Sequence, residues 1–385
     1  MILIAEPVHA GEVHLQVNSA FVLMLRELYK DHLIEVCAEQ KHTEAIRSRI
    51  RGHETGIVFN GFPSYNRSGY WYWPSKIWGE WRRIIKVMLQ ARKQQPELLV
   101  WLCLFPTGQW LLQLLSPLLL PQQRQLVILH GELEYLDQSP PVKRTDRFLG
   151  KVLRYALNHP APATRFIVLG TGIRERLRHQ ALKAWFQLYA LPHPYLYEGA
   201  ALPREHENPL KICLFGALKK AKNAHLFFEL AGRFRQEIAA GRIRFQTIGK
   251  IFPDLAHYRN EWVSCYRPDD FLPQEEYETV LRKNDLALFF YEAHQYRFSA
   301  SGAVHEAIFN GLPVWALSND YFTDVFNNNA LGLCYPSVEA MELALRSWLD
   351  SSSDSRFADY EKSRAVFFQE NAFLLQARLL HDIVL

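Results

Sequence analysis

The sequence predicts an α/β protein of two consecutive domains, each with a parallel sheet that carries helices on both faces. Three observations indicate this fold class. Short apolar runs alternate with amphipathic stretches along the whole chain, which is typical of strands and helices in parallel sheets. The length of 385 residues suits two domains better than one core. Several apolar runs end at a glycine or a His-Gly pair, where loops at the carboxyl ends of strands would begin.

The composition excludes several classes of protein. Hydrophobic residues make up 49% of the chain and charged residues 22%, which is ordinary for a folded globular protein. The formal net charge is only +4, so no nucleic-acid partner is expected. The five cysteines lie far apart without a Cys-x-x-Cys pair, which indicates reduced core residues rather than a disulfide framework or a zinc site. The first residues show no signal-peptide pattern, so a cytoplasmic location is expected.

The first half of the chain alternates predicted strands and helices. Apolar runs predict strands at Met1–Ala5, Leu33–Ala38, Gly56–Phe59, Leu98–Phe105, Leu126–His130 and Arg165–Leu169. Helical spacing predicts helices at Ala20–Lys30 (capped by Ser19), Thr43–Arg51, Ile77–Lys93, Gln109–Leu120, Asp146–Leu157 and Gly172–Leu182. A loop rich in aromatic residues is expected at Asn60–Pro74.

One uncharged segment, Leu98–Gln123, is long enough to span a bilayer. Pro106, Gly108 and Pro117 interrupt it, however, and polar glutamines lie between them. These residues favour a buried strand, a turn and a helix over a transmembrane helix.

The second half repeats the alternation after Glu205–Pro209, a polar segment that is expected to be a linker. Strands are predicted at Leu210–Phe215, Ile243–Ile248, Leu286–Phe290 and Pro313–Leu317. Helices are predicted at Lys222–Ala240, Pro273–Lys283, Val338–Leu349 and Arg356–Phe373, with a last one at the C-terminus. We therefore expect domains at residues 1–205 and 206–360, and a helical segment at 361–385 that packs back on the first domain.

The most informative segment for function is Phe298–Ala316, a small-residue loop that leads into a short predicted helix. The loop includes Ser299, Ser301 and Gly302, and it would leave the first N–H groups of the helix open to a phosphate. Glu306 lies about one turn into the helix, where a carboxylate could accept hydrogen bonds from a sugar diol. Such a pair suits a nucleotide diphosphate, although an ordinary loop-helix-strand unit has the same pattern.

Ordered pieces of the chain carry a family resemblance. They are Val127–Glu132, Thr164–Leu169, Ile212–Gly216 with Lys219–Asn223, Phe271–Tyr277, Asn284–Phe290 and Ser301–Val314. In this order they resemble the GT-B glycosyltransferases, in particular the large retaining group that uses nucleotide sugars. The resemblance implies two Rossmann-like domains that face each other across a cleft. The first would take the acceptor and the second the nucleotide-sugar donor.

The resemblance also implies roles for individual residues. Catalytic roles are expected for His130, Lys222 and Glu132, and donor contacts for Gly11, Lys219, Ser299, Ser301, Gly302 and Glu306. Lys222 would neutralise the departing pyrophosphate, and His130 would lie near the reacting sugar or acceptor. Glu132 would be the general base of an inverting enzyme. Each residue also has a plain alternative: a surface lysine, a helix cap, a surface ion pair or a structural histidine.

Two positions depart from the family pattern. Phe298 stands where the first of two glutamates is usual, and Ala217 stands where an arginine is usual. The first departure puts retention of configuration in doubt, and Lys219 or Lys220 would replace the missing charge. No Asp-x-Asp cluster is present, so no metal site and no cofactor are expected beside the nucleotide diphosphate sugar.

Residues 70–93 combine tryptophans with arginines and lysines. This pattern is typical of a helix that lies on an anionic membrane surface, and it would place the protein on the inner face of a membrane. A solvated basic helix with core tryptophans has the same composition.

Three functions fit the sequence. The leading one is transfer of a hexose from a nucleotide diphosphate sugar to a glycan or lipid-linked acceptor, in polysaccharide or glycoconjugate synthesis. A sugar-nucleotide epimerase shares the two-domain architecture, and a degenerate glycan-binding relative would explain Phe298. The donor sugar, its base, the acceptor, the linkage and the oligomeric state are left open.

Overall fold

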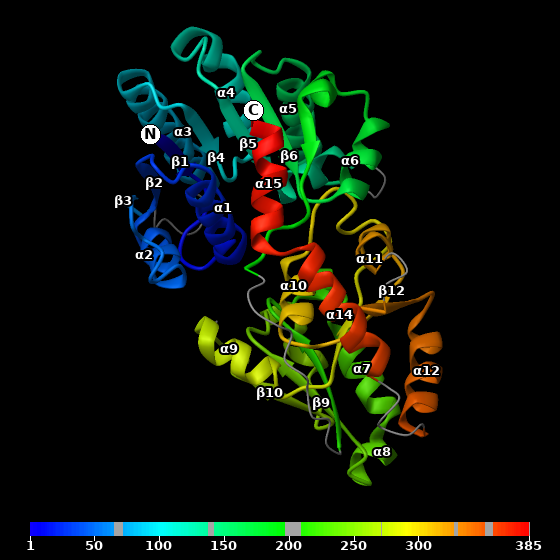
Figure 1. Cartoon of the computed structure of the whole chain (residues 1–385). Helices are drawn as coiled ribbons and strands as arrows, with labels where there is room; N and C mark the ends of the chain where they lie inside the picture. The colour runs from blue at the N-terminus through cyan, green and yellow to red at the C-terminus, as the bar shows by residue number, and fades with distance from the viewer. Residues whose placement is uncertain are drawn as a thin grey trace. The chain divides into compact units, whose positions relative to one another are not determined.

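The computed structural model describes residues 1–64, 72–137, 142–196, 209–270, 272–326, 330–350 and 357–384. The chain divides into two compact units (Figure 1). Unit 1 comprises Met1–Leu196, Tyr296–Ala300 and Asn371–Leu385, and unit 2 comprises Tyr197–Gln295 and Ser301–Glu370. The expected domain boundary at residues 205 and 206 lies outside the described residues.

Unit 1 is built on a parallel sheet with the strand order β3-β2-β1-β4-β5-β6-β7. Its strands are β1 (Ile2–Glu6), β2 (Ile34–Glu39), β3 (Ile57–Phe62), β4 (Leu98–Trp101), β5 (Gln125–Leu129), β6 (Thr164–Val168) and β7 (Leu188–Ala190). Every strand pair is parallel, and β1 pairs with β2 from Ile2 opposite Ile34 and with β4 from Ile2 opposite Leu98. The central strand β1 is buried along its whole length, as expected for a strand covered on both faces.

Helices cover both faces of this sheet (Figure 1). They are α1 (Leu15–Leu28), α2 (Gln40–Arg49), α3 (Tyr72–Gln94), α4 (Pro106–Leu119), α5 (Arg144–Asn158), α6 (Thr171–Arg178) and α15 (Phe373–Val384), with 3-10 turns η2 (Gly131–Leu136) and η3 (Lys183–Gln187). Ile2 and Ile4 of β1 join one core with α1, α2 and α15, whereas Leu3 and Ala5 join another with α3 to α6. Alternate side chains of one strand therefore supply two separate cores.

The C-terminal helix α15 closes the first of these cores. Ala377, Leu380, Ile383 and Val384 are buried in it, beside residues of α1. Burial of these side chains explains why the last residues of the chain belong to unit 1.

The uncharged segment folds as a strand and a helix, as the sequence predicted. β4 ends at Trp101 and α4 begins at Pro106, where proline suits the first helical position. No helix among the described residues is long and apolar enough to cross a membrane.

Unit 2 contains a second parallel sheet with the order β10-β9-β8-β11-β12-β13. Its strands are β8 (Leu210–Phe215), β9 (Ile243–Ile248), β10 (Val263–Tyr266), β11 (Leu286–Phe289), β12 (Val314–Leu317) and β13 (Gly332–Tyr335). The helices are α7 (His225–Arg233), α8 (Arg235–Ala239), α9 (Gln274–Leu281), α10 (Gly302–Phe309), α11 (Asp320–Phe326), α12 (Val338–Asp350) and α14 (Ala358–Glu370), with 3-10 turns η4 (Lys220–Lys222) and η5 (Pro253–Tyr258). The predicted α/β class and the two parallel sheets are confirmed.

Several predicted boundaries are wrong, and each has a local cause. Ser19 does not cap α1, because the helix begins at Leu15 and His14 is the N-cap. The predicted turn at Pro106–Gly108 is the first turn of α4. The predicted helix at 222–240 is three pieces, because Asn223 takes a left-handed conformation after η4 and a break at Phe234 separates α7 from α8.

The N-terminus of α4 depends on Gly108. The buried carboxyl of Glu80 accepts a hydrogen bond from the N–H of Phe105 at 2.7 Å, just before the helix. A Cβ on Gly108 would lie 2.1 Å from Oε1 of this carboxyl, so a side chain there must displace it.

We predict that Gly108→Ala destabilises the protein by about 1–3 kcal/mol, the usual cost of overpacking. The measurement is the free energy of unfolding in denaturant. Gly131→Ala is the control, because no atom lies within 4 Å of a Cβ built there. Equal stability of the two variants would show that Glu80 moves aside without cost.

Candidate functional site

Each sheet has a point where the strand order reverses. In unit 1 it lies between β1 and β4, and in unit 2 between β8 and β11. Loops from neighbouring strands leave in opposite directions there and open a crevice, which is where parallel α/β sheets bind ligands.

In unit 2, two glycines form the turns after β8 and β9. Gly216 has a φ of 95° and Gly249 a φ of 102°, a region that side chains disfavour. A Cβ on Gly249 would also lie 2.8 Å from the carbonyl oxygen of Gly216. The close approach of the two turns therefore requires glycine at position 249.

The side chain of Tyr277 connects Glu306 with the Gly216 turn. The hydroxyl of Tyr277 donates to Oε2 of Glu306 at 3.1 Å. The same hydroxyl lies 3.9 Å from the position that a Cβ on Gly216 would take. Tyr277 belongs to α9 and Glu306 to α10, so this contact brings the first turn of the sheet and the expected diol acceptor together.

The N-terminus of α10 is open. Ser301 is the N-cap residue, but its side chain makes no capping hydrogen bond. Gly302 is exposed, and no atom lies within 4 Å of a Cβ built on it. The carbonyl oxygen of Ser301 accepts a hydrogen bond from the Tyr321 hydroxyl at 3.3 Å, which fixes the cap. The helix end thus presents N–H donors and the positive end of its dipole to free space.

Lys222 lies in η4 and Lys219 directly precedes η4, so both come before α7 and neither is part of that helix. The ammonium of Lys222 lies 5.8 Å from the ring centre of Tyr291, the second residue after β11. Lys219 lies 4.2 Å from the ring of Phe252. The side chain of Asn223 donates to Glu292 at 3.2 Å, which ties this turn to the segment after β11. Lys222 therefore lies beside the strand next to β8 at the point where the order reverses.

Ser299 is placed differently from the other predicted donor residues. It belongs to unit 1, is 6% exposed, and its hydroxyl donates to Oε1 of Glu134 at 2.7 Å. The same oxygen accepts the N–H of Phe298 at 2.8 Å. The donor contact of Ser299 stays a prediction.

In unit 1, Glu6 at the end of β1 shapes the following loop. Its Oε1 accepts the N–H groups of Val8 at 2.8 Å and His9 at 2.9 Å. Burial alone would raise the pKa of Glu6, but the charge and hydrogen bonds of His9 and the charge of His42 outweigh it and lower the pKa to about 2. A charged carboxylate thus fixes the loop.

Gly11 lies in this loop and has a φ of 59°. Its N–H donates to Oε2 of Glu39 at 3.3 Å, and its carbonyl lies 2.6 Å from Nδ1 of His42. The predicted turn is therefore held on both sides, although no donor contact of Gly11 is established by this geometry.

A cavity of about 450 Å³ opens beside the loop. The loop after β1, the end of β2, the start of α2, the residue Ser64 after β3, and α3 line it. The lining residues are Pro7, Val8, His9, Ala10, Gly11, Val13, Glu39, Lys41, Ser64, Ser75, Lys76 and Arg83. Arg83 is 6% exposed and donates to the carbonyls of Pro7 at 2.8 Å and Pro63 at 2.7 Å. Carboxylates, cations and backbone groups around one hollow suit a ligand with many hydroxyls.

His130 and Glu132 are both buried at the end of β5. The N–H of His130 donates to Oε2 of Glu132 at 3.0 Å. Burial lowers the pKa of His130 to about 4 and raises the pKa of Glu132 to about 8. At neutral pH both groups are therefore uncharged, so His130 is suited to hydrogen bonding and Glu132 to donating a proton.

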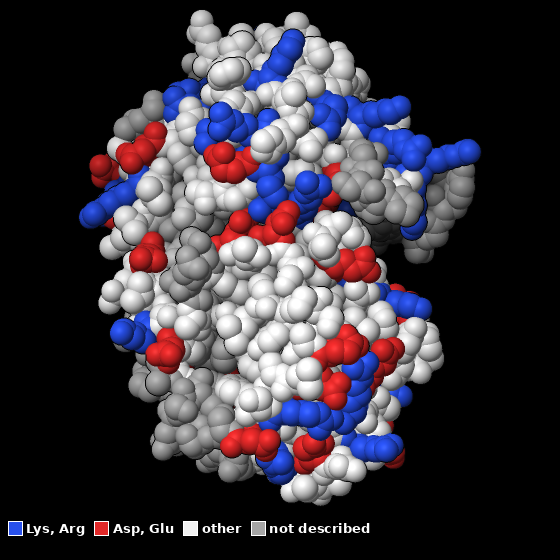
Figure 2. Space-filling view, turned by 90° about the vertical axis from the view of Figure 1, so that its right-hand side faces the viewer, with Lys and Arg blue, Asp and Glu red and all other residues white. Residues whose placement is uncertain are grey.

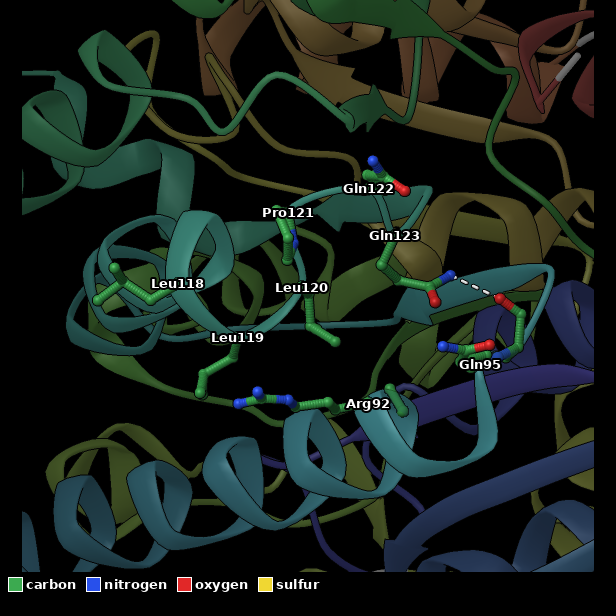
Figure 3. Close-up of a pocket in the computed structure, with 10 residues that line it drawn as sticks. Arg92, Gln95, Leu118, Leu119, Leu120, Pro121, Gln122 and Gln123 are labelled. Carbon is green, nitrogen blue, oxygen red and sulfur yellow. Dashed lines mark hydrogen bonds between the residues drawn. The ribbon is translucent and has the colours of Figure 1, made fainter.

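A second cavity in unit 1, of about 440 Å³, lies elsewhere. Figure 3 shows it between the C-terminal ends of α3 and α4, with Arg92 and Gln95 facing Leu118 to Gln123. Its loops lead into the amino ends of β4 and β5, the opposite edge of the sheet from the crevice. This position gives no reason to treat it as the reaction site.

Sequence reasoning missed Tyr277, Glu134 and Arg83. Tyr277 ends the segment Phe271–Tyr277, whose sequence indicates a turn before a helix but no contact with Glu306. Glu134 follows two residues after Glu132, and only the fold reveals that it meets residues 298 and 299. Arg83 was grouped with the surface cations of its helix, and its buried position follows from the helical phase of α3.

No protein-family profile matches the chain, and no curated protein matches it in sequence. Solved structures do match. HepE of Anabaena, in complex with UDP and glucose, has a TM-score of 0.67 at 12% identity over 99% of this chain and 98% of its own.

Two further structures are similar. Sucrose-phosphate synthase of Thermosynechococcus elongatus has a TM-score of 0.65 at 14% identity over 99% of this chain and 98% of its own. WaaG, a glycosyltransferase involved in lipopolysaccharide biosynthesis, has a TM-score of 0.64 at 11% identity over 100% of this chain and 99% of its own. These likenesses show a shared fold and confirm the expected GT-B class.

His305 gives α10 a pH-dependent stability. It is buried, its Nε2 lies 3.2 Å from the Tyr321 hydroxyl, and its ring lies 6.2 Å from that of Phe367. Burial lowers its pKa to about 3, against about 6.5 in the unfolded chain. The unfolded state therefore binds the proton more readily, so this contribution is complete above pH 6.5 and is lost as the pH falls toward 3.

We predict that His305→Asn flattens the decline of unfolding free energy between pH 6 and 4 by up to about 1.4 kcal/mol per pH unit. Denaturant unfolding at several pH values measures it. His159→Asn, which replaces an exposed histidine, serves as control. Parallel pH profiles for His305→Asn and the unchanged protein would contradict the assignment.

Proposed function

We propose that the protein is a glycosyltransferase that binds a nucleotide diphosphate sugar at the strand-order reversal of unit 2. The observation that carries this proposal is the contact between Tyr277 and Glu306 beside the Gly216 turn, with the open end of α10 one turn away from Glu306. A carboxylate and unpaired helix donors at this spacing match a ribose diol and a phosphate. The structural likeness to HepE, which was solved with UDP and glucose, supports the proposal.

The pyrophosphate would be held by Ser301 and Gly302 at the helix end and by the ammonium groups of η4. Lys222 is the residue that we propose to stabilise the leaving phosphate, with Lys219 as a second cation. Fixed positive charge where negative charge develops lowers the barrier to departure. These cations replace the charge of a metal, so donor binding in unit 2 is proposed to need no metal ion.

The acceptor would occupy the polar cavity of unit 1. Its lining groups, among them Glu39, Lys41 and Lys76, can bind sugar hydroxyls. The neutral imidazole of His130 would contribute a hydrogen bond nearby, and the protonated Glu132 would not act as a base until it loses its proton. Polysaccharide or glycoconjugate synthesis on the cytoplasmic side of a membrane is proposed as the setting.

Transfer of a hexose with retention of configuration is the finer part of the proposal. It rests on the resemblance of residues 301–314 to the retaining group, and Phe298 removes one of the usual carboxylates. The anomeric configuration of the product, measured by NMR, tests this part by itself.

We predict that Glu306→Gln weakens binding of the cognate nucleotide diphosphate by about 10–100-fold, because a charge-assisted hydrogen bond to the ribose is lost. A thermal-shift screen of UDP, GDP, ADP and CMP identifies the base, and calorimetry then gives the dissociation constants. Tyr277→Phe should weaken binding less, since it removes only the hydroxyl that positions Glu306.

Glu275→Gln is the matched control, because Glu275 is exposed on the same helix as Tyr277. Unchanged affinity in Glu306→Gln would contradict the donor site. An epimerase would convert the nucleotide sugar without an acceptor, so product analysis in the absence of acceptor distinguishes the two activities. A degenerate glycan-binding protein would bind none of the four nucleotides.

We also propose that α3 contacts an anionic membrane. The side chain of Trp78 is 60% exposed and that of Leu89 is 51% exposed. Together with the exposed Arg82, Ile85 and Arg92 they form one outward stripe, in which successive members are alternately four and three residues apart. Of the predicted segment 70–93, residues 70 and 71 lie outside the described residues. An exposed stripe that alternates apolar and basic side chains suits the interface of a bilayer.

A second basic face offers a control. Arg144, Arg147 and Lys151 are exposed on α5, and Figure 2 shows Lys and Arg gathered over the upper part of one face. Around α12, in contrast, Arg233 and Arg346 form ion pairs with glutamates. The α5 face therefore tests whether charge alone is sufficient.

We predict that reversing Arg82, Lys86 and Arg92 to Glu reduces sedimentation with anionic liposomes at least tenfold, because each basic residue contributes about 1 kcal/mol. Arg83 is left unchanged, since its hydrogen bonds to two buried carbonyls support the fold. Reversal of Arg144, Arg147 and Lys151 should have a smaller effect. The opposite order would assign the contact to α5.

A further inference from the structure

Two histidines and a cysteine come together at the strand-order reversal of unit 1. One ligand atom from each of His9, His14 and Cys103 lies within 4.8 Å of the other two. His9 follows β1, His14 precedes α1, and Cys103 follows β4. The two strands on either side of the crevice therefore supply the three groups, although they lie far apart in the sequence.

The backbone around these groups is fixed by other interactions. The N–H of His9 donates to Glu6, and Oε1 of Glu6 lies 3.4 Å from Nδ1 of the His9 ring. This is the place of the outer carboxylate that metal-bound histidines usually have. His14 takes a left-handed conformation with a φ of 59° and caps α1 without a side-chain hydrogen bond. The His14 ring therefore makes no capping contact with α1.

The polar atoms of the cluster are not satisfied by the described residues. Nδ1 of His14 is buried and has no hydrogen-bond partner there, whereas Nδ1 of His9 faces the carboxylate of Glu6. The His14 ring lies 4.2 Å from the His9 ring and 4.7 Å from the His130 ring, and Nε2 of His130 is also buried without a partner. Unsatisfied buried nitrogen atoms are destabilising, so a cluster of them indicates a missing ligand.

We propose that His9, His14 and Cys103 bind a divalent transition-metal ion of the zinc type. Imidazole nitrogen and thiolate sulfur are the ligands that this class of ion prefers, whereas Mg²⁺ and Ca²⁺ require oxygen. Three protein ligands leave one tetrahedral position for a water molecule or a substrate hydroxyl, as in catalytic zinc sites. His9 also lines the polar cavity of unit 1, so the ion lies at the edge of that cavity.

This inference does not depend on the proposed glycosyl transfer. No local pattern in the sequence indicates the site, because the spacing of the three residues matches no zinc motif and the composition predicts reduced core cysteines. The fold alone brings Cys103 to the histidines, and it leaves Cys37 of β2 in the core that α3 to α6 cover.

Cobalt(II) titration of the full-length protein tests the proposal. We expect one Co²⁺ per chain, tetrahedral absorption bands and a thiolate-to-cobalt charge-transfer band, all displaced by Zn²⁺. Zn²⁺ should also raise the melting temperature by mass action. If the unchanged protein gives no charge-transfer band and keeps no Zn²⁺ after dialysis, the proposal is overturned whatever the variants do.

Variants assign the ligands. Cys103→Ser should abolish the charge-transfer band and weaken Zn²⁺ binding at least tenfold, and His14→Gln should weaken binding to a similar extent. Cys37→Ser and the exposed His53→Gln are matched controls that should keep full binding. Circular dichroism confirms that each variant folds. A folded Cys103→Ser protein that retains the band would exclude Cys103 and overturn the site.

Discussion

The strand-order reversal in each sheet is the constraint on which the candidate sites depend. Where β1 meets β4 and β8 meets β11, successive loops leave to opposite sides, and the backbone cannot cover the strand ends. In unit 1 this gap receives the loop after Glu6 and the residues after β4. In unit 2 it receives the Gly216 turn and the side chain of Lys222. The order of the strands thus determines where each crevice lies, whichever side chains line it.

The ionisable groups near the two crevices differ in their degree of burial. Unit 1 buries several ionisable groups near the ends of β1, β4 and β5, and burial raises the pKa of Glu80 and Glu132 to about 8. Glu6 alone among these carboxyls is strongly acidic, because His9 lies against it and donates to it. A low-dielectric environment of this kind strengthens every hydrogen bond that a ligand makes.

In unit 2 the candidate charged groups are more exposed than in unit 1. The ammonium groups of Lys219 and Lys222 are partly exposed and lie over aromatic rings, and the helix donors at Gly302 face open space. A multiply charged ligand such as a diphosphate loses less hydration in an accessible site of this kind, and the fixed helix dipole supplies part of the attraction. The division of chemistry between the units therefore follows from the degree of burial.

Much of the fold was predictable because the parallel strands are apolar runs with sharp ends, and β8 and β9 were predicted to the residue. The strands β7, β10 and β13 were missed, because they are short and partly exposed at or near a sheet edge. The Ser301–Glu306 motif could be recognised in the sequence, because its residues are close together in the chain. Contacts between distant segments, such as Tyr277 with Glu306 or Cys103 with His9, have no local signal.

Phe298 shows why a departure from a family pattern needs the structure for its interpretation. The side chain is 1% exposed in the second core of unit 1, where a charged glutamate could not be solvated. A carboxylate is nevertheless present, because Glu134 of η2 binds the N–H of Phe298 and the hydroxyl of Ser299. The carboxyl group at this loop thus comes from a different segment of the chain, and burial raises its pKa. Since Ser301 follows two residues later as the cap of α10, Glu134 fixes the backbone that leads into the proposed donor site.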